Sequence, residues 1–316
     1  MKLKNLLLIA LVAIVFCGCQ SNYQPTSITV ASYNLSNANG GDSTNGNGWG
    51  QRYPVIAKMV QYHDFDIFGT QECFIHQLKD MKEALPGYDY IGVGRDDGKE
   101  KGEHSAIFYR TDKFDVIEKG DFWLSETPDV PSKGWDAVLP RICSWGHFKC
   151  KDTGFEFLFF NLHMDHIGKK ARVESAFLVQ DKMKELGKGK ELPAILTGDF
   201  NVDQTHQSYD AFVSKGVLCD SYEKAGFRYA INGTFNDFDP NSFTESRIDH
   251  IFVSPSFQVK RYGVLTDTYR SIVGKGEKKQ ANDCPEEIDI KTYQARTPSD
   301  HFPVKVELEF DQRQQK

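Results

Sequence analysis

The sequence predicts an α/β protein in which antiparallel or mixed β-sheets pack on one another and helices lie outside them. Of the 316 residues, 40% are hydrophobic and 26% are charged, an ordinary globular composition that excludes disordered, collagen-like and coiled-coil chains. Apolar, β-rich segments are mixed with helical patterns without strict βαβ alternation, and the segment 155–162 follows directly on another strand. No linker rich in proline, glycine and serine divides the chain, so we expect one large domain.

The predicted elements follow from the apolar pattern and the turn residues between segments. The predicted strands are 28–35, 65–70, 105–109, 142–150, 155–163, 193–198, 249–253 and 304–310. The predicted helices are 54–62, with a proline in its first turn, 74–85 and 171–186. The apolar side of the last helix is expected to carry Val173, Phe177, Met183 and Leu186. Two polar segments, 37–50 and 274–282, are predicted to be exposed loops.

The N-terminal residues 1–19 have the pattern of a targeting signal. Lys2 and Lys4 precede an unbroken apolar run at 6–16, which is too short to span a bilayer. Cys19 follows a small residue and precedes a polar stretch. This arrangement resembles a bacterial lipoprotein signal, which implies that Cys19 is lipidated and that the protein is exported and attached to a membrane, in the periplasm or at the outer membrane or cell surface. A plain cleaved signal or a buried N-terminal helix is the alternative.

The charge and the cysteine content bear on the possible substrates and on disulfide bonds. The formal net charge is −6, and loss of the signal would remove two lysines and no acid, so a broad basic face for a long polyanion is not expected. The cysteines beyond the signal fit neither zinc spacing nor a dense disulfide framework. Cys143 and Cys150 either pair across a hairpin or stay free, and free thiols are favoured because a domain of this size needs no covalent cross-link.

Polar side chains that suit phosphate and metal chemistry stand at the ends of the predicted strands. They are Asn34, Glu72, His163, Asp199, Asn201, Asp249, Asp300 and His301. Strand ends are rigid positions, so several strands can aim such groups into one cleft. Carboxylate and amide oxygens suit a hard cation such as Mg²⁺ or Mn²⁺, whereas zinc favours more histidine or cysteine.

The residues of these segments and their order along the chain resemble the motifs of the endonuclease/exonuclease/phosphatase superfamily. The matching motifs are Ser-Tyr-Asn (32–34), Gln-Glu (71–72), Asn-Leu-His (161–163), Gly-Asp-Phe-Asn (198–201), Arg-Ile-Asp-His-Ile-Phe (247–252) and Pro-Ser-Asp-His-Phe-Pro-Val (298–304). The likeness covers residues 28–310 and implies a four-layered α/β sandwich, two packed mixed β-sheets flanked by helices. A short tether at 20–27 and a polar tail at 311–316 would flank this catalytic domain. The resemblance also implies hydrolysis of a phosphate ester by activated water with Mg²⁺ or Mn²⁺.

The resemblance implies metal ligands first. Glu72 would be the firmest ligand, with Asn34 helping through its amide oxygen. Asp300 would be a second metal ligand or the group that orients His301. The alternatives are a surface acid and turn residues at strand ends.

The resemblance also implies roles in catalysis. Asp199 would activate or orient the attacking water, and Asn201 would bind a non-bridging phosphate oxygen. His301 would contact the phosphate, with His163 on the opposite wall, and both histidines would carry positive charge beside a phosphate dianion. Asp249 would orient the far histidine or aid the leaving group.

The remaining candidates are weighed against ordinary structural roles. Arg141 is predicted to clamp the substrate phosphate, with an ion pair to a nearby acid as the alternative. His250 is expected to be structural, because it faces away from Asp249 in a regular strand. Asp165 and His166 are left outside the catalytic set. Core or rim packing is favoured for the aromatic residues Trp49, Trp135 and Trp145.

The function predicted from these residues is an exported, metal-dependent phosphohydrolase. Its partners would be a phosphate-ester substrate and, through the N-terminal lipid, a membrane; no protein partner is predicted. The acidic charge disfavours long duplex DNA, and no apolar hairpin suited to a bilayer is evident, so a small or medium phosphate ester is favoured. The alternatives are a nuclease for short nucleic acids, an inactive binding lipoprotein on the same scaffold, and a non-phosphate metallohydrolase.

Overall fold

The computed structural model describes residues 25–187, 189, 192–276, 278, 283, 285 and 287–311. The predicted signal and lipidation site at Cys19, most of the tether and most of the polar tail lie outside these residues. Strand β1 already begins at Thr26, two residues before the expected start of the domain. Among the described helices, none combines the length and the apolarity needed to cross a membrane.

One sheet has seven strands around β1 (Thr26–Asn34). Strand β1 pairs in parallel with β2 (Ile67–Gln71) and antiparallel with β15 (Val304–Phe310). The remaining strands are β4 (Ile107–Arg110) and β3 (Tyr88–Ile91) beyond β2, and β12 (Gln258–Val264) and β10 (Phe227–Tyr229) beyond β15. The sheet is therefore mixed, and its central strands β1 and β2 both end on the same edge.

The second sheet has six strands. Their order is β5 (Phe114–Trp123), β6 (Ile142–Cys150), β7 (Glu156–His163), β8 (Ala194–Asp199), β11 (Asp249–Val253) and β9 (Cys219–Asp220). Strands β6 and β7 form the antiparallel pair that the adjacent segments predicted, whereas β7 and β8 run in parallel. Strand β11 runs antiparallel to β8, so the start of β11 lies beside the end of β8.

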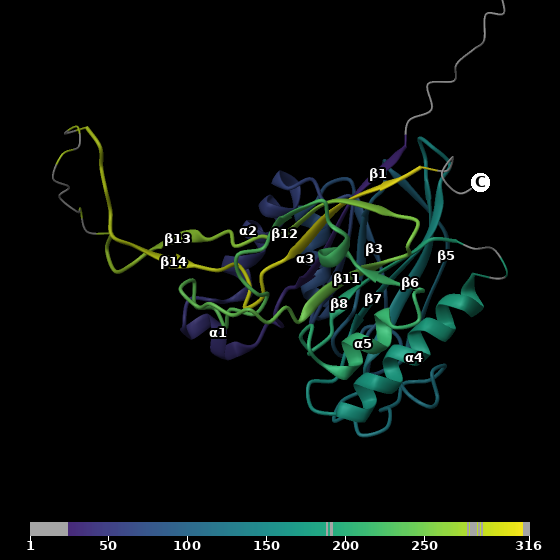
Figure 1. The fold of residues 1–316 in the computed structure, drawn as a ribbon. Coiled ribbons are helices and arrows are strands. Elements are labelled where there is room, and N and C mark those ends of the chain that lie inside the picture. The colour runs from purple at the N-terminus through teal and green to yellow at the C-terminus, as the bar shows by residue number, and fades with distance from the viewer. Residues whose placement is uncertain are drawn as a thin grey trace, which may run out of the picture.

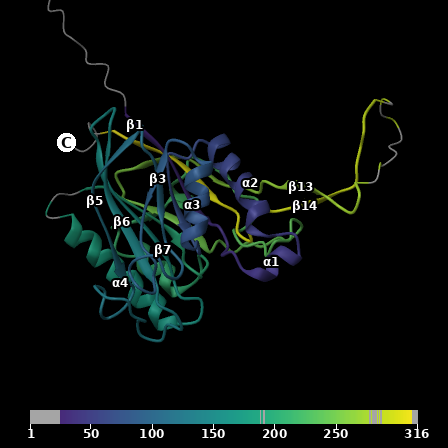
Figure 2. The ribbon, with the colours of Figure 1, turned by 180° about the vertical axis from the view of Figure 1, so that it is seen from behind.

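Helices cover the outer face of each sheet, as Figures 1 and 2 show from opposite sides. Helices α2 (Trp49–Tyr62) and α3 (Ile75–Ala84) pack on the seven-stranded sheet through a cluster that includes Ile56, Leu78 and Phe108. Helices α4 (Lys169–Leu186) and α5 (Gln207–Val213) pack on the six-stranded sheet. A third cluster, rich in phenylalanine, fills the space between the sheets. The four-layered α/β sandwich is thus confirmed.

The structure also adds elements that the apolar pattern did not indicate. The strands β3, β9 and β10 and the helices α1 (Gly40–Thr44), α5 and α6 (Ser221–Lys224) are too short for a periodic pattern to be recognised, and the longer strands β5 and β12 were also missed. The predicted loop at 37–50 contains α1, whose N-cap Asn39 accepts hydrogen bonds from two backbone N–H groups. In α4 the buried side carries smaller residues such as Ala176 and Val179, which let the helix approach the sheet closely, while Val173 and Phe177 are only half-buried.

Strands β13 (Tyr269–Ile272) and β14 (Tyr293–Arg296) form a two-stranded hairpin that projects from the body of the protein (Figure 1). Ile272 and Tyr293 on this hairpin are exposed, but polar residues such as Arg270 and Gln294 lie in the same two strands. Its strands are too short and too polar to be predicted from the sequence. The loop predicted at 274–282 lies between these strands and falls largely outside the described residues.

Cys143 and Cys150 are free and buried, and they stand at opposite ends of the single strand β6. An extended strand separates its ends by about 3.3 Å per residue, so these cysteines are far too distant to form a disulfide. The favoured free-thiol state is therefore confirmed.

A buried amide, Asn161, joins the two sheets. Its Nδ2 donates to the carbonyl oxygens of Thr70 and Ala106 in and beside the seven-stranded sheet, and its Oδ1 accepts from Gln71 Nε2 and Thr197 Oγ1. All four hydrogen-bonding positions of the amide are thus used. Gly69 makes the approach possible, because a Cβ there would lie 2.2 Å from Asn161 Oδ1.

We expect Asn161→Ala to lower the free energy of unfolding by about 3 kcal/mol, since it leaves several buried donors and acceptors without partners. Urea denaturation followed by circular dichroism measures the loss. Asn241→Ala, at an exposed turn, is the control and should change stability by less than roughly 0.5 kcal/mol. Equal stability of the two variants would contradict the bridging role of Asn161.

Candidate active site

The ends of five strands meet at one edge of the sandwich. In the six-stranded sheet, Asp199 at the end of β8 pairs with His163 at the end of β7 and with Asp249 at the start of β11. In the seven-stranded sheet, Asn34 ends β1 and Glu72 follows the last residue of β2. The connection before β15 brings Asp300 and His301 to the same cleft. This cleft has a volume of about 410 Å³.

Asn34 lies between the carboxylates of the two sheets. Its Nδ2 donates to Glu72 Oε1 and to Asp199 Oδ2, each at 3.0 Å. Its Oδ1 accepts the backbone N–H of Ser36, which fixes the orientation of the amide. The structure therefore presents the nitrogen of Asn34 to the site, whereas a metal-binding role was expected for its oxygen. In this arrangement Asn34 holds the two carboxylates together.

Glu72 is held in place by its surroundings. Its backbone φ is +67°, a left-handed conformation that is uncommon for residues other than glycine. Its Oε2 accepts from both the backbone N–H and the side-chain Nδ2 of Asn37. Asn37 belongs to the polar segment 37–50, whose glycine and asparagine content gave no reason to place any one residue in the site.

His301 and Asp249 form a buried hydrogen-bonded pair. The Nδ1 of His301 lies 2.9 Å from Asp249 Oδ2, and its Nε2 lies 3.8 Å from Asp199 Oδ2. Burial alone would lower the pKa of His301, but the carboxylates of Asp249, Asp199 and Asp300 raise it well above its usual range. His301 is therefore a protonated cation, and Asp249 holds the proton on Nδ1.

His163 is in the opposite state. Burial, with the nearby charges of Arg141 and Arg95, lowers the pKa of His163 well below its usual range. Asn201 Nδ2 donates to the Met164 carbonyl and lies 3.0 Å from His163 Nε2, so Nε2 accepts and the proton sits on Nδ1. His163 is thus neutral, and the expectation that it carries positive charge is not met, because the cations around it oppose a further charge.

Three carboxyl groups that line the cleft have raised pKa values. Burial and the charge of Asp249 raise the pKa of Asp199 to about 7. Burial raises the pKa of Glu103 to about 7 as well, against the lowering effect of Arg95. Glu103 lies in a loop between β3 and β4 and lines the cleft, with its Oε2 3.9 Å from His163 Nδ1. Asp300 also lines the cleft, and burial raises its pKa.

Arg141 lines the cleft and also forms the ion pair considered as the alternative for it, while its role as a phosphate clamp stays a prediction. Its Nε donates to Asp165 at 3.4 Å, and its Nη2 lies 2.9 Å from His166 Nδ1. Its Nη1 is buried and has no hydrogen-bond partner. Asp165 holds the guanidinium in place, so the positive charge of Arg141 is fixed at the wall of the cleft.

The structure separates residues that touch the cleft from those that support it. His250 faces away from the site, as predicted, and stacks on Phe252 while its Nε2 contacts the Val202 carbonyl. His166, which was left outside the catalytic set, lines the cleft. The sequence reasoning also missed Glu103, because the loop that carries it has no apolar strand leading to it. The three tryptophans considered above do not line the cleft, and Trp49 and Trp145 are buried packing residues.

The donor groups fit a hard divalent cation. Ligand atoms of Glu72, His163 and Asp199 lie within 4.8 Å of one another. Those of Asp199, Asp249 and His301 are equally close, but a protonated histidine has no free lone pair for a metal, so the first group is the better cation site. Carboxylate oxygens dominate the first group, and the raised pKa of Asp199 reflects a buried negative charge that a cation would stabilise. Asp300 lines the same cleft but belongs to neither group.

The comparisons with known proteins agree with this geometry. A family model described as the Endonuclease/Exonuclease/phosphatase family matches residues 31–301. The chain belongs to this family. Members of the family are hydrolases that act on phosphate esters, so the cleft described above is the candidate active site of an endonuclease/exonuclease/phosphatase enzyme.

Three proteins resemble this chain over most of its length. A crystal structure of a family protein from Bacteroides thetaiotaomicron is 84% identical, covers 92% of this chain and 98% of that chain, and has a TM-score of 0.85. A mannosyl-6-phosphatase from Bacteroides thetaiotaomicron VPI-5482 is 85% identical, covers 90% and 100%, and has a TM-score of 0.83. An uncharacterised mimivirus protein is 30% identical over 276 residues, which are 83% of this chain and 92% of that protein.

The residues of the cleft can carry out ester hydrolysis with water. Ionised Asp199 can accept a proton from a water molecule, and Asn201, whose backbone N–H donates to Asp199 Oδ1, stands beside it. Protonated His301 can donate to a phosphate oxygen, and the positive charge of Arg141, which also lines the cleft, attracts a phosphate. A divalent cation bound by the carboxylates would add charge neutralisation at the phosphate.

We expect Asp199→Asn to lower turnover of p-nitrophenyl phosphate by about a thousandfold, because the amide cannot accept the proton. The thermal midpoint should stay roughly the same, since the substitution removes a buried charge without changing the size of the side chain. Steady-state kinetics and thermal melts measure both effects. Asp152→Asn, at an exposed turn between β6 and β7, is the matched control. Turnover close to that of the wild-type enzyme would show that Asp199 is not the base.

Proposed function

We propose that this protein is a Mg²⁺- or Mn²⁺-dependent phosphomonoesterase that removes the 6-phosphate from a mannose unit. The observation that carries this proposal is the 85% identity to a mannosyl-6-phosphatase over the whole length of that chain. In the reaction, the oxygen of water forms a bond to phosphorus and the bond between phosphorus and the sugar O6 breaks. The products are inorganic phosphate and the free sugar hydroxyl.

The charges of the cleft favour a phosphomonoester as the substrate. A phosphomonoester is a dianion near neutral pH, with one more negative charge than a diester. Protonated His301 and Arg141 provide two positive charges beside the proposed cation site. The side chains of Leu139, Phe235 and Ile248 add apolar surface to the cleft, which suits the carbon face of a sugar ring.

The proposed specificity can be tested by comparing substrates in Mg²⁺. We expect kcat/KM for mannose 6-phosphate to exceed that for bis(p-nitrophenyl) phosphate and for a short oligonucleotide by at least about tenfold. Phosphate release and product chromatography measure the rates, and the Asp199→Asn enzyme reports any contaminating activity. Faster cleavage of the diester or the oligonucleotide would reject the monoesterase in favour of a phosphodiesterase or nuclease.

Chelation tests the metal part of the proposal in the same assay. Dialysis against EDTA should abolish release of phosphate, and added Mg²⁺ or Mn²⁺ should restore it. Full activity after chelation would contradict the metal requirement.

We further propose that the protein is an exported lipoprotein attached to a membrane through Cys19. The support is the sequence pattern of residues 1–19, with its short apolar run ahead of Cys19. Cys19→Ser should move the protein from the membrane fraction to the soluble fraction, as followed by immunoblot. Cys17→Ser changes a cysteine of the same segment and should leave the protein in the membrane fraction. Retention of the Cys19→Ser variant would reject lipidation at this position.

A further inference from the structure

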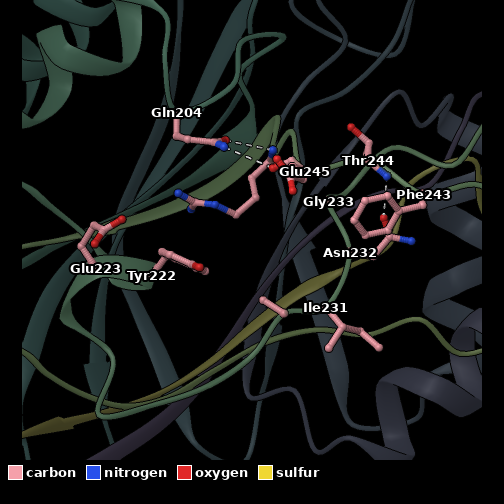
Figure 3. Close-up of a pocket in the computed structure, with 11 residues that line it drawn as sticks. Gln204, Tyr222, Glu223, Ile231, Asn232, Gly233, Phe243, Thr244 and Glu245 are labelled. Carbon is pink, nitrogen blue, oxygen red and sulfur yellow. Dashed lines mark hydrogen bonds between the residues drawn. The ribbon is translucent and has the colours of Figure 1, made fainter.

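A second cavity of about 370 Å³ lies beside the catalytic cleft, and we call it the distal pocket. It is formed by helix α6, by the segment 230–233 that follows β10, and by the segment 243–247 that precedes β11. Figure 3 shows Tyr222 and Glu223 on one side of the pocket and Asn232 with Phe243 on the other. No residue of the predicted active site lines it.

The walls of the distal pocket are held by hydrogen bonds. Asn232 Oδ1 accepts the backbone N–H of Thr244, and Asn232 Nδ2 donates to the Ser242 carbonyl. The N–H of Gly233 donates to the Thr244 carbonyl at 2.6 Å. A Cβ at Gly233 would lie 2.1 Å from the Ser246 carbonyl oxygen, so the close approach of the two segments requires glycine. The pocket is therefore a built feature of these two segments.

The chemistry of the distal pocket favours a neutral, hydroxyl-rich ligand. Arg247 is buried, donates to Asp220 at 3.0 Å and stacks 3.9 Å from the ring of Tyr222, so its charge is already compensated. Glu223 and Glu245 are exposed carboxylates that would repel a phosphate or a nucleic acid. The ring of Phe243 is 69% exposed, and an aromatic face can stack on the C–H face of a pyranose.

The distal pocket and the catalytic cleft are separated by one narrow strip of chain. Phe235 and Ile248 line the cleft, whereas Gly233 and Arg247 line the distal pocket. Thr234 lies between them and is fully buried. Its N–H donates to Ser246, and its Oγ1 accepts the N–H groups of Ile248 and Asp249. Residues on either side of Thr234 therefore line the two cavities, which makes the cavities neighbours.

We propose that the distal pocket binds a neutral sugar unit attached to the phosphorylated mannose, so that the enzyme prefers a phosphorylated oligosaccharide to a phosphorylated monosaccharide. This inference rests on the proposed mannosyl-6-phosphatase function for its substrate class. Carboxylates and amides at the rim bind the hydroxyl groups, and Phe243 stacks on the ring.

The test compares Phe243→Ala with the wild-type enzyme on mannose 6-phosphate and on 6-phosphorylated mannotriose. The variant should lower kcat/KM for the trisaccharide by about tenfold and leave that for the monosaccharide unchanged. Phe227→Ala removes an equally large, 60% exposed aromatic ring that does not line the pocket, and it should change neither value. Equal effects of Phe243→Ala on both substrates, or none on either, would overturn the proposal.

A binding measurement separates this proposal from the proposed function. Calorimetric titration of the Asp199→Asn protein with unphosphorylated mannotriose needs no hydrolysis, and it should show binding that Phe243→Ala abolishes. If mannose 6-phosphate is not hydrolysed but mannotriose binds, the sugar site stands and the phosphatase assignment fails. If mannose 6-phosphate is hydrolysed and mannotriose does not bind, the distal pocket is not a sugar site.

Discussion

The active site depends on a buried polar layer that locks the two sheets together. Asn161 joins Gln71 of one sheet to Thr197 of the other, and Gln71 Nε2 lies 3.3 Å from Ser32 Oγ. Each of these residues stands one or two positions before a residue of the site. Since side chains two apart in a strand share a face, the layer sets the distance between the strand ends above it. A slip between the sheets would separate Glu72 from Asp199.

The meeting of the strand ends costs electrostatic energy, because it brings acidic side chains together. The same negative charge attracts a cation. Acidic side chains from both sheets share one partly buried cleft, and neighbouring carboxylates would oppose one another's ionisation. The chain relieves part of this with protonated His301 and Arg141, and His163 remains neutral between the cations. The remaining negative charge is what makes the cleft receptive to a divalent cation and, through it, to a phosphate.

Much of this organisation is visible in the sequence, and the failures have physical reasons. Polar residues at the ends of apolar strands predict Glu72 and His163 because the strand itself sets their position. Glu103 comes from a loop and reaches the cleft only through the fold of that loop, which no periodic pattern describes. The orientation of Asn34 is equally hidden, since the choice between its oxygen and its nitrogen depends on the Ser36 N–H. The short, exposed strands of the hairpin lack the apolar alternation on which strand prediction relies.

Chemistry and recognition are placed on different parts of the fold. The groups that would act on phosphate lie at strand ends, where the sheets hold them rigidly. The distal pocket lies on the connections around residues 230–248, which lie outside the strands of both sheets. Thr234 couples the two, because its hydroxyl accepts from the backbone at the start of β11, which carries Asp249. Changes in these connections can therefore alter which ester is selected, while the strand ends beneath Thr234 preserve the hydrolytic groups.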